Sequence, residues 1–225
     1  MSKQQRPVKL RVLPVLVYRA THLNFRLALI ISYWNKIRST KDIKAIKKIL
    51  ADKPRDLCLF TLGINTNLRA SDLLRIKVNQ VFQLKSGDDL ILKEKKTGKA
   101  RRITLNKTVY ESIRNLLMSD NFSHDDFLFR SQRSAMSPGS SDSIRSPLTA
   151  PFLSRLATSW CKMINLKGNY ASHTLRKTWG YHQRVSFNVG IPELMVCFNH
   201  STQRQTLDYL CIQPEEIKSV YLNEL

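Results

Sequence analysis

The chain has 225 residues, of which 42% are hydrophobic, and it carries 37 lysines and arginines against 17 acidic residues. This hydrophobic share suffices for a packed core and argues against a wholly disordered chain. A formal net charge of +20 repels itself in a compact fold unless a polyanion lies nearby. Nucleic acid is therefore the first expected partner, ahead of a membrane surface.

The N-terminal stretch, as far as about Ser39, is basic and has mixed periodicity, which predicts either a strap or a helix around Leu27–Ile37. The next segment, STKDIKAIKKIL, has the pattern of an amphipathic helix with Ser39 as its N-cap. Its apolar stripe consists of Ile43, Ile46 and Leu50.

Two more helices are expected before the pattern changes. Pro54 suits the first turn of the helix PRDLCLFTLGI, and Ser71 suits the cap of a short helix after the turn NTNLRA. Residues 81–105, VFQLKSGDDLILKEKKTGKARRITL, then indicate short strands separated by residues 86–87 and 96–99. We expect a small antiparallel sheet with a basic tip.

Helical spacing returns over Lys107–Met118, with Asn106 as a cap, and Ser131–Ser146 has the composition of a loop. From Thr149 onwards the pattern predicts four or five helical segments, interrupted at Gly168, at 190–192, at Asn199 and at Pro214. The predicted fold class is mainly α with one small antiparallel β-sheet, an α+β arrangement.

The cysteines and the N-terminus indicate the compartment. The four cysteines show no metal-ligand spacing and lie in apolar stretches, so we expect buried free thiols in a reducing environment. The N-terminus leads into no signal-type segment, and the run Leu27–Tyr33 is too short to cross a bilayer. The sequence predicts a cytoplasmic protein. The cysteines are Cys58, Cys161, Cys197 and Cys211.

Four short motifs contain residues suited to phosphodiester chemistry. Taken singly, each motif is weak, because an arginine or lysine is usually solvated charge and a tyrosine at helical spacing is usually core. Their coincidence in fixed order, in a chain this basic, favours a functional interpretation. The motifs are TNLRASDLL with Arg69, KTGKARRITL with Lys96, SHTLRKTW with His173 and Arg176, and FNHSTQRQTLDYL with His200 and Tyr209.

Together these motifs resemble the tyrosine recombinase, or phage integrase, family over roughly Ile43 to Leu225. That family has an Arg in a turn before a short helix, a Lys on a β-hairpin and a His-x-x-Arg pair on a helix. A His or Trp follows, and the Tyr lies nine residues beyond it, as Tyr209 does from His200. The resemblance implies the tyrosine recombinase catalytic-domain fold. In length the chain is similar to short single-domain members such as fimbrial phase-variation invertases.

The resemblance implies a site-specific recombinase that cleaves and rejoins DNA through a 3′-phosphotyrosyl link. Arg69 and Arg176 would clamp the phosphate with planar guanidinium groups, and His200 would donate a further hydrogen bond. Tyr209 would be the nucleophile, although its phenol needs activation because its unperturbed pKa is about 10.

Proton transfer falls to the two remaining residues. His173 is the candidate for managing the proton of the nucleophile, and Lys96 is the candidate general acid for the leaving 5′ oxygen. Because the covalent link stores the energy of the broken bond, neither ATP, a metal ion nor another cofactor is expected.

Two asparagines depart from the family pattern. Asn67 and Asn199 stand where the family usually has Gly, before the first Leu-Arg and before the late His. Because Asn tolerates left-handed backbone geometry best after Gly, we expect the same turns here.

The expected domain organisation is a basic extension or helix over 1–40, too short for a complete core-binding domain, and a catalytic domain over 41–225. A tail helix is expected from about residue 214. It either packs on its own core or, as is common in the family and slightly favoured here, docks on a neighbouring protomer. The expected partners are double-stranded DNA, a homo-tetramer assembled on DNA from monomers or dimers, and accessory DNA-bending proteins.

Further basic residues are expected to contact backbone phosphates. They lie on the predicted hairpin and in the C-terminal helices: Lys93, Lys95, Lys99, Arg101, Arg102, Arg184 and Arg204.

Three other functions are compatible with parts of the pattern. A type IB topoisomerase uses similar residues to relax DNA, although the short core favours recombination. A relative that binds DNA without cleaving it would have lost at least one of the six residues by drift. A basic DNA-binding protein with coincidental motifs lacks the support of a helix-turn-helix or zinc signature. The target sequence, and the choice between integration, excision, inversion and resolution, depend on the DNA.

Overall fold

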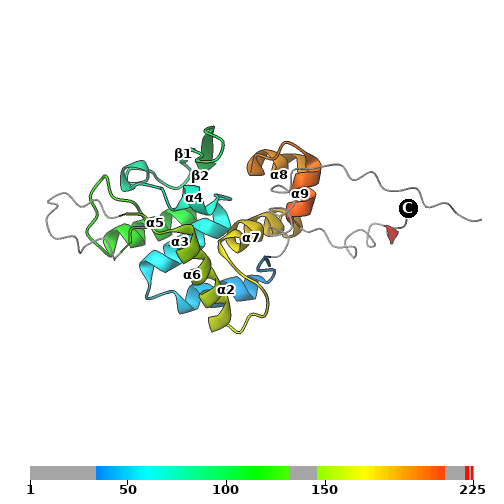
Figure 1. Cartoon of the computed structure of the whole chain (residues 1–225), viewed down its shortest axis with the longest axis horizontal. Coiled ribbons are helices and arrows are strands. Elements are labelled where there is room, and N and C mark those ends of the chain that lie inside the picture. Colours follow the sequence, from blue (N-terminus) through cyan, green and yellow to red (C-terminus); the bar gives the residue numbers. More distant parts are fainter. Residues whose placement is uncertain (1–33, 132–145, 211–220, 223, 225) are drawn as a thin grey trace, which may run out of the picture.

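The structure is a computed structural model that describes residues 34–131, 146–210, 221–222 and 224. In this part of the chain, a body of helices carries a β-hairpin and a pair of short helices on the same side (Figure 1). The predicted fold class is confirmed. The elements are α2 (Thr40–Ile49), α3 (Pro54–Asn65), α4 (Ala70–Leu73), the 3-10 turn η1 (Val78–Gln80), β1 (Asp89–Lys93), β2 (Ala100–Thr104), α5 (Lys107–Met118), α6 (Ala150–Met163), α7 (Ser172–Val185), α8 (Ile191–Phe198) and α9 (Gln203–Leu210).

Several expectations lie outside the described residues: the structure of most of the N-terminal extension, of the serine-rich loop over 132–145, of Cys211 and of the tail from about 214. Among the described residues, no helix is long and apolar enough to span a membrane.

The main core is built around α3, which packs against α5 and α7. Phe60 is fully buried in it, and the ring of Trp160 from α6 contacts Phe60 edge-on at a centroid distance of 5.7 Å. Helices α2 and α5 begin where the sequence predicts. Ser39 Oγ accepts a hydrogen bond from Lys41 N at the start of α2, and Asn106 Oδ1 accepts one from Val109 N at the start of α5.

The hairpin pairs β1 with β2 antiparallel, and Leu90 lies opposite Ile103. The expected strand before Ser86 is wrong. There the backbone amides bond locally, as from Phe82 N to Val78 O and from Leu84 N to Val81 O, after the turn η1. Phe82 is 44% exposed, whereas Val81 is buried and Leu84 is partly buried, so the inward-facing apolar residues follow the spacing of one helical turn and not strand alternation.

The turn between α3 and α4 places Arg69. Asn67 has φ 52°, the left-handed geometry expected for it, and the chain re-enters helix at Ala70. The N-cap residue of α4 is Arg69 in extended conformation, so the assignment of Ser71 as the cap is wrong. Ser71 lies inside the first turn, where its hydroxyl donates to Asp72 Oδ1 at 3.3 Å.

Residues 34–37 form a strap and not a helix. Ile37 N donates to Thr178 Oγ1 at 2.9 Å, and the Lys36 ammonium donates to the carbonyl of Leu210 at 2.8 Å. The strap therefore joins the middle of α7 to the last residue of α9. Of the two alternatives that the sequence left open, the strap is observed in this segment.

Helices α8 and α9 pack on α7 through a small apolar cluster of their own, Leu194, Phe198, Tyr209 and Leu210. Only one side of α8 turns towards this cluster. Cys197 lies on the other side and is exposed, so its predicted burial is wrong, whereas Cys58 and Cys161 are buried as predicted.

Gly180 permits this close packing. A Cβ at this position would lie 2.5 Å from Phe198 Cζ and 2.8 Å from Leu210 Cδ2, both of which belong to the α8–α9 cluster. We therefore expect Gly180→Ala to lower the free energy of unfolding by about 1–3 kcal/mol through overpacking. Urea unfolding followed by circular dichroism measures this change. An unchanged midpoint would mean that the two helices shift without cost.

Candidate active site

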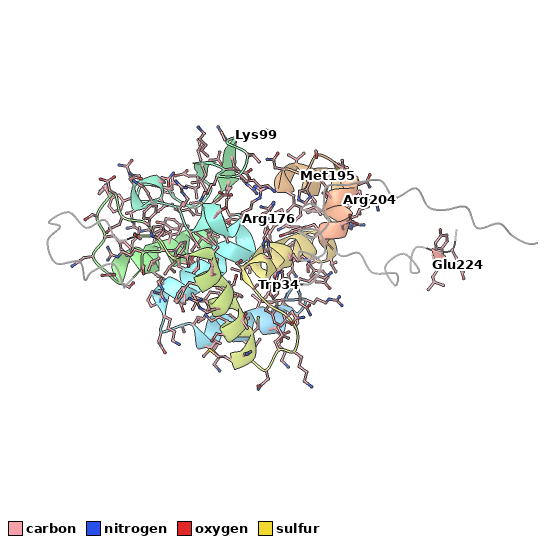
Figure 2. The ribbon with its side chains drawn as sticks, viewed as in Figure 1. Trp34, Lys99, Arg176, Met195, Arg204 and Glu224 are labelled. Carbon is pink, nitrogen blue, oxygen red and sulfur yellow. The ribbon has the colours of Figure 1, made fainter. Side chains whose placement is uncertain are left out.

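The six candidate catalytic residues come from five segments. Figure 2 shows Arg176 between the hairpin, marked by Lys99, and helices α8 and α9, marked by Met195 and Arg204. Arg69 precedes α4, Lys96 lies in the turn between β1 and β2, and His200 follows α8. His173 and Arg176 belong to the first turns of α7, and Tyr209 belongs to α9.

Arg176 is buried at the centre of the site, with 4% of its surface exposed. Its Nη2 donates to the carbonyl of Phe198 at 2.9 Å, and its guanidinium carbon lies 5.9 Å from the centre of the Tyr209 ring. Burial lowers the pKa of Arg176 to about 10, and nearby Tyr209 opposes this shift, so the group is charged at neutral pH. Its Nη1 is buried and has no hydrogen-bond partner among the described residues. Such a donor requires an acceptor.

The Tyr209 side chain is surrounded by basic groups. Tyr209 is 8% exposed, and the His200 ring meets its ring edge-on at a centroid distance of 5.6 Å. Lys177, which the sequence reasoning missed, is 1% exposed, and its ammonium lies 5.6 Å from the Tyr209 ring centre. Nothing in the local sequence around Arg176 and Lys177 indicates that the lysine side chain is buried.

His200 is placed by the left-handed residue before it. Asn199, with φ 54°, ends α8, and the His200 ring then stacks on Phe198 at a centroid distance of 5.0 Å. Its Nδ1 lies 3.0 Å from Thr206 Oγ1 on α9. Burial, followed by the positive charges of Arg176, Arg69 and Lys96, lowers the pKa of His200 to about 4. The ring is therefore neutral at pH 7.

The other three candidates line the same region. The Arg69 side chain is 21% exposed, and Lys96 and His173 are exposed at the surface. Partial desolvation, followed by the charges of Arg176 and Lys177, lowers the pKa of His173. The positive charges of Arg69 and Lys96 contribute to the lowered pKa of His200, and that of Arg176 contributes to the lowered pKa of His173. The six residues that the sequence singled out therefore lie in one region of the structure.

Glu94 is a further residue that the sequence reasoning missed. Its side chain is 2% exposed and lies 2.8 Å from Arg69 and 3.0 Å from Arg101. Although burial raises the pKa of Glu94, hydrogen bonds from Thr97 and Arg101 and the charge of Arg69 lower it to about 2. A signal was present: Glu94 is the one acidic residue within the basic stretch 93–102.

Most residues predicted to contact phosphates lie at the surface. Lys99 and Arg204 point away from the body on the hairpin and on α9 (Figure 2), and Arg184 is partly buried near the end of α7. Arg101 differs from this picture. Its guanidinium turns inward, donating from Nη1 to Glu94 and from Nη2 to the carbonyl of Cys197 at 2.8 Å. The other exposed members of the set are Lys93, Lys95 and Arg102.

Solved structures share this fold. The chain superposes on XerA recombinase with a TM-score of 0.66 at 15% identity, covering 84% of this chain and 65% of XerA. It matches XerH site-specific recombinase, bound to palindromic difH substrate, with a TM-score of 0.64 at 15% identity, covering 84% and 52%. The chain thus spans about two thirds of XerA and half of XerH. The fold is that of the tyrosine recombinase catalytic domain.

The family follows from the sequence comparisons. The model of the phage integrase family matches residues 38–216. The probable integrase/recombinase YoeC of Bacillus subtilis (strain 168) is 32% identical over 195 residues, which cover 82% of this chain and 93% of YoeC. The chain belongs to the phage integrase family. This membership supports a site-specific DNA recombinase, and none of these matches favours a topoisomerase.

The environment of His200 gives a prediction for stability against pH. The folded state holds the pKa of His200 near 4, whereas an unfolded histidine titrates near about 6.5, so the unfolded chain binds more protons between these values. The stability that neutral His200 contributes is therefore present above about pH 6.5 and is lost as the pH falls towards about 4.

Urea titrations of the wild type and of His200→Gln between pH 4 and pH 7 measure this effect. On acidification through that window, we expect the wild type to lose more unfolding free energy than the variant. Parallel curves for the two proteins would contradict a neutral, buried His200.

Proposed function

We propose that this chain is a site-specific DNA recombinase of the integrase or invertase type, which cleaves and rejoins strands through a 3′-phosphotyrosyl link at Tyr209. The observation that carries this proposal is the buried Nη1 of Arg176. This atom has no acceptor among the described residues, and the guanidinium carbon lies 5.9 Å from the centre of the Tyr209 ring, so a phosphate oxygen bound there would supply the acceptor.

The phosphate would be held by three donors. Arg176 and Arg69 present guanidinium groups, which match two oxygens of a phosphate and remain charged. Neutral His200 adds a third: when its Nδ1 accepts from the Thr206 hydroxyl, the proton of the ring resides on Nε2 and is available for donation. These groups stabilise the charge that develops on the non-bridging oxygens as the bond to Tyr209 forms.

The exchange conserves bonds and protons. The phenolic oxygen of Tyr209 bonds to phosphorus while the bond from phosphorus to the 5′ oxygen breaks. His173 takes part in removing the phenolic proton, and Lys96 at the hairpin tip supplies a proton to the departing 5′ oxygen. Rejoining reverses each step with a 5′ hydroxyl as the nucleophile, so the reaction consumes no ATP and needs no metal ion.

Double-stranded DNA is the proposed partner. XerH is bound to its difH substrate, and lambda integrase is bound as a dimer to a COC′ core site, in structures that share this fold. The charge of +20 and the exposed cations of the hairpin support binding to backbone phosphates. We further propose a homo-tetramer assembled on DNA, assisted by accessory DNA-bending proteins, and action in the cytoplasm. In that assembly, the tail from about 214 docks on a neighbouring protomer.

Covalent trapping tests the proposed function. Nicked duplexes from the genomic flanks of the gene are incubated with the protein in chelator and without ATP, denatured and separated on a gel. We expect a band of protein joined to a DNA 3′ end with the wild type and none with Tyr209→Phe, because the phenolic oxygen forms the bond. Tyr110→Phe, a change at a partly exposed tyrosine on α5, is the matched control and should keep the band. Tight binding without any adduct would contradict the proposal.

The role of Lys96 is tested through the leaving group. Lys96→Ala is expected to slow cleavage of ordinary DNA by about 10²–10⁴-fold, as for loss of a general acid. A substrate whose 5′-bridging oxygen is replaced by sulfur releases a thiolate, which leaves without protonation. Lys96→Ala should therefore cleave that substrate about as fast as the wild type, whereas Arg176→Ala should remain slow on it. A rate that stays low for Lys96→Ala on the sulfur substrate would assign the lysine to phosphate binding.

A further inference from the structure

Glu94 lies where three segments of the site meet, and no step of the proposed reaction uses it. Both carboxylate oxygens are engaged. Oε2 lies 2.8 Å from Arg69 Nη1, and Oε1 accepts a hydrogen bond from Arg101 Nη1 at 3.0 Å. With 2% of its side chain exposed, Glu94 is among the most buried charged groups of the described chain.

Two further contacts connect Glu94 to the other parts of the site. Thr97 Oγ1 donates to Oε2 at 2.8 Å, and Thr97 directly follows Lys96 at the hairpin tip. Asn199 Nδ2 donates to the same oxygen at 3.2 Å, and Asn199 directly precedes His200. One carboxylate thus connects the N-cap of α4, the hairpin tip and the turn between α8 and α9.

We propose that Glu94 is a positioning residue of the cleavage site. Its carboxylate holds the Arg69 guanidinium, and with it the segments that carry Lys96 and His200, in the arrangement that the scissile phosphate requires. This inference rests on the proposed function and deepens it, because it names the residue that fixes one arm of the phosphate clamp.

The geometry favours positioning over competition with the phosphate. A guanidinium has five N–H donors, so the contact of Nη1 with Glu94 leaves donors of Arg69 available to an anion, and its side chain is 21% exposed. Glu94 is also held by Arg101, Thr97 and Asn199. A phosphate that displaced it would break all of these contacts and strand a buried charge.

The test compares cleavage with binding in Glu94→Gln, which keeps the size of the side chain and removes its charge. We expect adduct formation on the nicked duplex to slow by about 100-fold, the cost of a misplaced reacting group. Affinity for the same DNA should be unchanged or higher, because a negative charge is lost. A variant that merely unfolds would lose both, so the split between rate and affinity is specific to positioning.

Glu111→Gln is the matched control, since it removes the same charge from an exposed position on α5, where Glu111 faces Lys107 at 3.9 Å. It should cleave at the wild-type rate. A second comparison uses the Arg69→Ala background. There, Glu94→Gln should slow adduct formation less than it does in the wild type, because the part of its effect that passes through Arg69 is absent.

The possible outcomes separate this inference from the proposed function. If the wild type forms the adduct and Glu94→Gln forms it equally fast, the positioning role is overturned and the proposed function stands. A faster Glu94→Gln also overturns it, because the carboxylate would then compete with the phosphate for Arg69. If the wild type itself forms no adduct through Tyr209, the proposed function fails, and the positioning role fails with it.

Discussion

The arrangement of this site depends on holding like charges close together in a region that water reaches poorly. Arg176 and Lys177 are almost completely buried, and Arg69 and Arg101 both pair with Glu94, which directly follows β1. Charges of one sign held close together raise each other's energy. Burial, followed by these positive charges, also lowers the pKa of His200. The fold offsets the repulsion in two ways. Glu94 pairs with two of the arginines, and the rings of Phe198 and Tyr209 lie within reach of the Arg176 guanidinium. A phosphate bound at the proposed site would add a further counter-charge.

Helix α7 connects the site to the rest of the molecule. Its first turns carry His173, Arg176 and Lys177, its middle binds the strap over 34–37, and Gly180 brings α8 and α9 close. Tyr209 therefore sits in a cluster separate from the main core. Because a small cluster buries fewer apolar contacts, α9, which carries Tyr209, can separate from the body at a lower free-energy cost than a core helix. The strap limits that separation, since Lys36 binds the carbonyl of Leu210.

Local sequence signals succeeded where one residue governs its own backbone. The caps Ser39 and Asn106, the first-turn Pro54 and the left-handed Asn67 and Asn199 are all in the predicted conformation. The signals failed where a neighbour in space decides. Residues 81–84 have the composition of a strand, yet their amides bond within a turn. Arg101 stands in a run of surface cations, yet its guanidinium turns inward to a carboxylate seven residues away in sequence.

The sequence by itself determined the fold class, the family and the identity of the six candidate residues, because these rest on spacing, on capping residues and on residue types that phosphate chemistry demands. Only the tertiary structure decided how the pKa values of Glu94, Arg176 and His200 shift and which neighbours hold these groups. Burial and Coulomb interactions act through space between segments as distant as Lys36 and Leu210, or Glu94 and Asn199. No local pattern encodes those distances, so the buried Lys177 and the bridging role of Glu94 emerged only once the chain was folded.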